Sequence, residues 1–276
     1  EAALDSLAAY SQIDTLTTEV IVSEDPGITP AAPVEQIDTT VVADVTETMP
    51  FKDSILNASY QRNENAAYHK ISNSLVEIKL TTKGAQPYSV KIKDYMTYDS
   101  TALYLIEKGA SQYGISLYAG ENINTKDFVF QVVEHTDSTI VMQLPFAGGG
   151  YIQQRFFLPA DSYMMQNELS LVNMDGVIPR NVSMLDIDWS VVIPRLEKGY
   201  KNEKQYSNLD YYFTGDKKPE NMGRGRDGNE RIDTKLKWFA FQQQFFSAIM
   251  TAENEFASAD LSLKFFSESE YKNEDK

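Results

Sequence analysis

The chain has 276 residues, of which 42% are hydrophobic, a formal net charge of −15 and no cysteine. This composition allows one large or two small domains with a proper core, and it excludes a disulfide framework, a thiolate metal site and a cysteine nucleophile. The negative charge argues against a nucleic-acid partner, which would require a basic surface, and the lack of any run of about 18 apolar residues argues against a direct membrane span.

Residues 1–50 form an acidic segment. They hold ten acidic side chains and no lysine or arginine, against a net charge of −15 for the whole chain. Their one aromatic residue is Tyr10, and prolines stand at positions 26, 30, 33 and 50. A segment that repels itself and has few large side chains to bury is expected to stay extended. We therefore predict a disordered acidic tether over residues 1–57 and a folded domain over residues 58–276.

Short strands with alternating hydrophobicity follow the tether. Val76, Ile78 and Leu80 alternate with polar residues, and a KGAQP turn then leads to a second alternating run at 88–93. This pattern predicts a hairpin with one solvated face. Glycines 148–150 predict a second hairpin turn, and further strands are predicted at 102–106, 113–118, 128–134, 138–144, 151–158, 163–173, 182–193 and 257–266. The spacing indicates a mostly β chain folded as a sandwich or barrel.

Two stretches depart from this rhythm. Residues 197–233 are polar and rich in tyrosine and glycine, which predicts a long excursion over the surface. Residues 238–250, WFAFQQQFFSAIM, are the most apolar and aromatic stretch of the chain. The spacing of Trp238, Phe241 and Phe245 fits a helix, whereas the aromatic residues and the glutamine triplet fit two strands that meet at a kink. We favour the strands.

The polar residues offer few candidates for chemistry. His69 and His135 stand alone, outside any metal-binding spacing, and neither is predicted to bind a metal or to catalyse a reaction. Asp186 and Asp188 would share one face of a strand and could serve as an acid and a base. Because Ile187 and its apolar neighbours take the other face, we expect the aspartates to face water, although such a face could also line a ligand groove.

The glycine-rich loop at 223–228, GRGRDG, invites a phosphate-binding interpretation. It lacks the G-K-[ST] ending of such loops, and the residues after it lack the spacing of a calcium-binding loop, so we predict a flexible surface loop. No G-x-S-x-G nucleophile motif is present in the sequence. The sequence therefore predicts neither an enzyme nor a cofactor.

Two motifs carry a resemblance to a known family. The apolar stretch resembles the W-x-A-x-x-Q-Q-[FY]-F signature in the periplasmic domain of the bacterial membrane-protein insertase family YidC, through Trp238, Ala240, Gln243, Gln244, Phe245 and Phe246. The run LVEIKLTTKGA at 75–85 is similar to that domain's first strand and its T-[KR]-G-[GA] turn, in which Gly84 is the glycine. The resemblance covers roughly residues 60–265.

The resemblance implies a fold and a location. The fold is a β super-sandwich of two twisted antiparallel sheets with little helix, similar in architecture to the sugar mutarotases. In the family this domain is inserted between the first and second transmembrane helices. The chain would then lie on the periplasmic side of the bacterial inner membrane, anchored by transmembrane segments outside it.

The resemblance also implies a function. In the family a membrane bundle inserts client membrane proteins with or without the Sec translocon, and the periplasmic domain is thought to contact auxiliary subunits of that translocon. The implied role of this chain is thus a non-catalytic docking or spacer domain, which the acidic tether would connect to the first transmembrane helix. Because the family domain continues past the aromatic signature, closing strands are expected beyond residue 276. A carbohydrate-binding or mutarotase-like protein and a surface adhesin are the alternatives.

Overall fold

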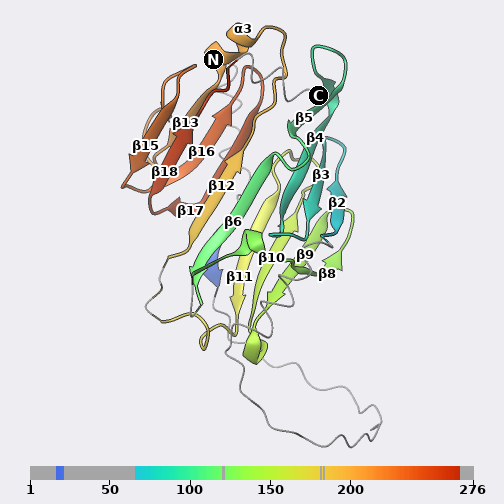
Figure 1. Ribbon diagram of the computed structural model, residues 1–276, viewed down its shortest axis with the longest axis vertical. Helices are drawn as coiled ribbons and strands as arrows, with labels where there is room; N and C mark the ends of the chain where they lie inside the picture. Colours follow the sequence, from blue (N-terminus) through green and yellow to red (C-terminus); the bar gives the residue numbers. More distant parts are fainter. Residues whose placement is uncertain (1–16, 22–65, 120–121, 181, 183, 268–276) are drawn as a thin grey trace, which may run out of the picture.

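The structure is a computed structural model that describes residues 17–21, 66–119, 122–180, 182 and 184–267. Strands dominate these residues, and many of them run along the long axis of the molecule (Figure 1). Hydrogen bonding divides the strands into five sheets, in which every pair is antiparallel except the pair formed by β1. The predicted mostly β sandwich class is confirmed.

The first sheet contains the hairpin predicted near its start. Its strands, in order, are β2 (Tyr68–Ser72), β3 (Val76–Thr81), β4 (Gln86–Met96) and β5 (Ala102–Ile106). Val76, Ile78 and Leu80 of β3 are buried, whereas the polar residues between them are partly exposed. The alternation in the sequence therefore marks the face of this sheet that packs on the core.

The second sheet has the order β1-β11-β10-β9-β8, with bounds β1 (Thr17–Ile21), β8 (Gln131–His135), β9 (Thr139–Pro145), β10 (Tyr151–Phe157) and β11 (Gln166–Val172). β9 and β10 are joined through a 3₁₀ turn, η3 (Ala147–Gly149). Gly148 and Gly149 have φ angles of 84° and 83° there. Glycine adopts such angles at little cost, and the predicted glycine turn is confirmed.

The third sheet carries the two aspartates that the sequence singled out. Its order is β12 (Asp186–Val191), β6 (Ser111–Tyr118) and β7 (Asn122–Asn124), and a 3₁₀ turn, η2 (Thr125–Asp127), follows β7. β12 pairs with β6 from Asp186 opposite Ser116 to Val191 opposite Ser111. In the order of this sheet β12 is an edge strand.

The apolar stretch at 238–250 forms two strands, as favoured from the sequence. The fourth sheet has the order β14 (Glu220–Asn221), β13 (Asn208–Tyr212), β16 (Leu236–Gln242) and β17 (Ser247–Phe256). The fifth sheet pairs β15 (Gly228–Ile232) with β18 (Ala259–Leu263). β16 and β17 form an antiparallel hairpin whose turn is the glutamine-rich part of the stretch.

The prediction of a surface excursion over 197–233 is wrong. This stretch contains α3 (Tyr200–Tyr206) and strands β13, β14 and β15. Leu209 and Tyr211 of β13 are only 1% and 5% exposed. β13 is held by its antiparallel partner β16, more than twenty residues later in the chain, so the local polar composition does not reveal it.

The core has two parts that meet. The larger part joins the first three sheets and includes Ile71, Ile115 and Phe156. The smaller part lies between the fourth and fifth sheets and consists of Leu209, Tyr211, Ile232, Leu236 and Leu261. Phe239 and Phe256 pack against both parts, so the fourth sheet is continuous with the rest of the fold.

The predicted tether lies mostly outside the described residues. Of residues 1–57 only Thr17–Ile21 is described, as strand β1 parallel to β11. The tether and the boundary at residue 58 therefore stay predictions. Among the described residues, no helix has the length and apolar character that crossing a bilayer requires.

Candidate functional site

The turn between β16 and β17 holds four of the six signature residues. The Gln243 amide donates a hydrogen bond to the carbonyl of Phe246 (2.8 Å), which closes the turn. The Gln243 side chain is 5% exposed, and its Nε2 donates to the carbonyl of Pro194 (2.6 Å). Gln244 Oε1 accepts a hydrogen bond from Asn202 Nδ2 (3.4 Å). Both glutamines therefore attach the turn to the segment around α3.

The aromatic members of the signature divide between the core and the surface. Phe246 packs against the larger core and meets Tyr95 edge to face, with ring centroids 5.5 Å apart. Phe245, its neighbour, is 67% exposed. On β16, Ala240 is buried and Trp238 stacks on Tyr212 with ring centroids 5.8 Å apart. All of the signature except Phe245 thus has a packing or hydrogen-bonding role.

Gly84 occupies a turn in which a side chain would not fit. Its φ is +74°, and its amide donates to the carbonyl of Phe128 (2.8 Å). A Cβ at this position would lie 2.8 Å from Gln86 Nε2 and 3.0 Å from Lys126 Cα. The turn after β3 is therefore pressed against the segment around η2, and glycine is required there for both its conformation and its size.

Asp186 and Asp188 lie on the exposed face of β12, where the alternation of the sequence put them. Asp188 Oδ2 accepts hydrogen bonds from Ser116 Oγ (3.0 Å) and Asn124 Nδ2 (2.9 Å). These bonds connect all three strands of the third sheet. The carboxylate of Asp188 thus has a structural role, while both aspartates also border the groove described next.

An open groove of about 1100 Å³ lies beside β12 and the fourth sheet. Trp189 of β12 meets Phe239 and Phe241 of β16, with ring centroids 6.0 and 5.3 Å apart. Glu203 of α3 also borders the groove, and burial raises the pKa of its carboxyl, whose Oε1 accepts the amide of Leu196 (2.9 Å). Aromatic and charged side chains therefore share the lining of this groove.

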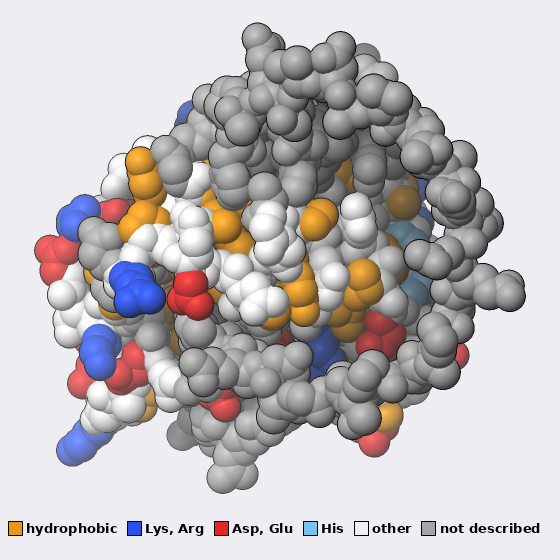
Figure 2. All heavy atoms as spheres, turned by 90° about the horizontal axis from the view of Figure 1, so that it is seen from below, with side chains coloured by type: hydrophobic (Ala, Val, Ile, Leu, Met, Phe, Trp, Pro, Cys, Tyr) orange, Lys and Arg blue, Asp and Glu red, His pale blue; other side chains and the backbone are white. Residues whose placement is uncertain are grey.

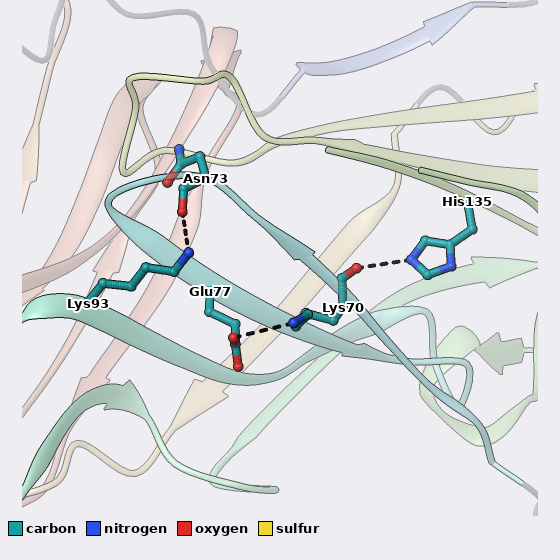
Figure 3. Close-up of polar contacts among 5 residues, drawn as sticks. All are labelled: Lys70, Asn73, Glu77, Lys93 and His135. Atoms are coloured by element: carbon teal, nitrogen blue, oxygen red, sulfur yellow. Dashed lines mark hydrogen bonds and ion pairs between the residues drawn. The ribbon is translucent and has the colours of Figure 1, made fainter. Parts of the chain in front are cut away.

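The two histidines stand alone in the sequence but lie against each other in the structure. His69 on β2 and His135 on β8 meet edge to face with ring centroids 5.0 Å apart. His135 Nε2 is 3.0 Å from the carbonyl oxygen of Lys70 (Figure 3), and imidazoles reach the surface in the view of Figure 2. Burial, and then the charge of His135, lower the pKa of His69.

The histidine pair lies at a junction between the first and second sheets. The Ser72 amide donates to the carbonyl of Asp137 (2.8 Å) across the same junction. On the β2–β3 side, Lys70 pairs with Glu77 at 3.7 Å and Lys93 Nζ donates to the carbonyl of Asn73 (Figure 3). The histidines and the two aspartates of β12 thus belong to different sheets. Across the described part of the chain, no three His, Cys, Asp or Glu residues are grouped to hold a metal ion.

β13 carries a further carboxyl with an altered pKa. Burial raises the pKa of Asp210 to about 6, although Arg224 and a hydrogen bond from Asn208 Nδ2 (2.6 Å) act in the opposite direction. Asp210 lies opposite Ala240 of the signature strand and Asn221 of β14. Burial of the carboxyl on β13 is the main cause of the raised pKa, and sequence reasoning missed Asp210 because β13 itself was missed.

Comparison with known proteins decides the family. Residues 69–274 match a family model described as the YidC periplasmic domain. The chain belongs to this family. The matched residues include both sequence motifs and almost all of the described fold, so the resemblance inferred from the two motifs is confirmed.

Three relatives, each named Membrane protein insertase YidC, illustrate the extent of the match. The relative from Bacteroides fragilis is 33% identical over 199 residues, which are 72% of this chain and 32% of the relative. The relative from Porphyromonas gingivalis is 29% identical over 197 residues, 71% of this chain and 31% of the relative. The relative from Azobacteroides pseudotrichonymphae is 33% identical over 203 residues, 73% of this chain and 33% of the relative. The chain thus spans about a third of the length of these YidC relatives.

Within the YidC periplasmic domain, the structure separates two kinds of signature residue. Gly84, Ala240 and Gln243 are buried or sterically constrained, so each is explained by the fold. Phe245 contributes nothing visible to the core and projects from the turn.

Proposed function

We propose that this chain is a non-catalytic periplasmic domain of a membrane-protein insertase, and that it acts as a docking or spacer module on the periplasmic side of the inner membrane. In this role it assists the insertion and folding of inner-membrane proteins, with or without the Sec translocon. Client proteins would be handled by membrane segments outside this chain. The domain itself would bind auxiliary subunits of the translocon.

The match of residues 69–274 to the YidC periplasmic domain carries this proposal. The printed name of the relatives, membrane protein insertase, describes the whole proteins, of which this chain spans about a third. Two of the polar residues singled out by the sequence have structural roles, since Gln243 holds a turn and Asp188 is hydrogen-bonded within its sheet.

The groove beside β12 is the surface we assign to the translocon subunits. It presents Trp189 and Phe241, and large aromatic residues contribute most of the free energy at protein interfaces. The exposed side of β12 continues this surface through Ser190 and the two aspartates. A partner could therefore contact an aromatic centre with a polar rim, which is the usual anatomy of such interfaces.

Site-specific photo-cross-linking in the full-length protein tests this assignment. A photoreactive phenylalanine analogue at Ser190, which is exposed at the groove, is expected to capture an auxiliary subunit of the translocon. The matched control places the same analogue at Val133, which is 53% exposed on β8 and does not border the groove. Equal capture from both positions, or capture from neither, would contradict docking at the groove.

A further inference from the structure

One end of the molecule carries a set of exposed, mostly aromatic side chains, which we call the aromatic end. They come from the end of β4 and the turn that follows it, the segment before α3, the last turn of α3 and the turn between β16 and β17. α3 and the ends of β4 and β5 lie at this end of the ribbon in Figure 1. The exposed fractions are Tyr95 51%, Met96 72%, Tyr98 45%, Val192 44%, Tyr206 44% and Phe245 67%.

Contacts among these segments hold the aromatic end together. Arg195 donates from Nη2 to the hydroxyl of Tyr98 (2.6 Å), and its guanidinium lies 5.3 Å from the centre of the same ring. The Tyr98 amide donates to the carbonyl of Leu196 (3.2 Å). The signature turn is joined to β4 through the Phe246 and Tyr95 rings. The projecting side chains therefore stand on a connected base rather than on independent loops.

Positive charge accompanies these side chains. Residues 192–206 contain Arg195, Lys198, Lys201 and Lys204, against Glu197 and Glu203. Glu203 is 5% exposed and is hydrogen-bonded to the amide of Leu196, so it contributes little to the surface. The chain as a whole carries a net charge of −15. The segment before and within α3 is thus locally basic, and its Arg195 and Lys204 also border the groove beside β12. Close to the turn of the neighbouring β4–β5 hairpin lie one basic residue, Lys93, and two acidic residues, Asp94 and Asp99.

We propose that the aromatic end docks on the surface of a phospholipid bilayer that contains anionic headgroups. Tyrosine gains free energy at the boundary between headgroups and acyl chains, where its apolar ring and its hydroxyl group are both satisfied, and the ring of phenylalanine gains free energy by leaving water. Lysine and arginine beside them are attracted to anionic headgroups. This attraction orients the domain with α3 towards the lipid.

The shape of this end favours lipid over a protein partner. Met96 and Phe245, the two most exposed side chains, project from the end of a strand and from a hairpin turn. Projecting tips insert readily into a deformable lipid interface, whereas a protein partner would need a matching hollow for each tip. The inference depends on the proposed function in one respect, namely that a membrane lies close to the domain.

Vesicle flotation of the 276-residue chain tests the proposal. We expect the chain to float with vesicles of phosphatidylethanolamine and phosphatidylglycerol, and less with phosphatidylcholine alone or at high salt. The double substitution Met96→Ser with Phe245→Ser is expected to weaken partitioning at least about tenfold. The matched control is Met184→Ser, because Met184 is 68% exposed and precedes the opposite end of β12. Circular dichroism would verify that each variant is folded.

A fluorescent reporter gives a second measurement. Phe245→Trp is expected to shift its emission to the blue on addition of these vesicles, whereas Tyr118→Trp, at the far end of β6, is expected not to. Absence of flotation, or equal partitioning of the double variant and the Met184 control, would overturn the proposal. Capture of a protein by cross-linkers at Phe245 without any vesicle binding would overturn it too. Cross-linking at Ser190 tests the proposed function, and its outcome does not depend on the outcome of the vesicle measurements.

Discussion

Gln243 donates a hydrogen bond from Nε2 to the carbonyl of Pro194 at 2.6 Å, joining the signature turn to the segment that leads into α3. The two residues lie far apart in the sequence, and neither is in a regular element. This single bond explains why a glutamine stands at a turn between two apolar strands. The Gln243 side chain is buried, and it supplies the carbonyl of Pro194 with a hydrogen-bond donor in place of a backbone amide.

Loss of this bond should destabilise the fold. Gln243→Ala leaves the carbonyl of Pro194 without that donor in a covered position, so the free energy of unfolding is expected to fall by about 1–3 kcal/mol. Gln244→Ala is the control, because Gln244 is less buried and its bond to Asn202 is longer, at 3.4 Å. Urea unfolding measures both. Equal losses for the two variants would show that the contact with Pro194 has no special role.

Gly84→Ala should be costly for two reasons. The φ of +74° is unfavourable for alanine, and the new Cβ would lie 3.0 Å from the backbone Cα of Lys126. We expect the free energy of unfolding to fall by about 2 kcal/mol or more. Gly176→Ala has no atom within 4 Å of the new Cβ, and its φ is not positive, so its effect should stay within about 0.5 kcal/mol. A stability of Gly84→Ala equal to wild type would contradict the steric account.

Hydrophobic alternation and turn residues predicted those elements whose pairing partners lie close by in the sequence. The hairpin of β3 and β4, the glycine turn before β10 and the paired strands β16 and β17 all follow from alternation and turn residues within a short stretch. The predicted strand at 257–266 is shorter in the structure, as β18 (Ala259–Leu263). Its ends depend on pairing with β15, which the sequence did not indicate.

Long-range pairing accounts for what the sequence could not predict. Leu209 and Tyr211 of β13 are buried because they pack in the smaller core between the fourth and fifth sheets, and the polar surroundings of β13 gave no sign of that. His69 and His135 meet only because β2 and β8 come together at a junction between two sheets. The solvated face of Asp186 and Asp188 was predictable, because strand alternation is a local property, but the hydrogen bonds of Asp188 to β6 and β7 were not.

His69 should give a measurable titration. Burial and the neighbouring His135 both lower the pKa of His69 below its ordinary value of 6.5, so its neutral form is favoured in the folded state. The resulting stability is present above pH 6.5 and is lost as the pH falls through the lowered pKa. NMR of the imidazole carbon-bound protons would measure the midpoint. In His135→Gln the pKa of His69 is expected to rise only part of the way, because burial remains. A midpoint at or above 6.5 in the wild type would be inconsistent with the contact.

Asp210 should produce the opposite pH dependence. Its pKa is raised by burial from 3.8 to about 6, so the folded state holds the proton more tightly than the unfolded state. The contribution of Asp210 is therefore most favourable below pH 3.8 and declines as the pH rises to about 6. Asp210→Asn, which keeps the acceptor for Asn208, is expected to raise the melting temperature relative to wild type more at pH 8 than at pH 5. A difference that does not depend on pH would refute the raised pKa.

Deletion of residues 66–267 from the full-length insertase, with a flexible glycine–serine linker in their place, tests the central claim most directly. The measurement is co-purification of auxiliary subunits of the Sec translocon from membranes, with insertion of a client protein followed in parallel. A docking module predicts that co-purification is lost while the membrane segments still insert the client. Co-purification at the wild-type level after the deletion would contradict the account.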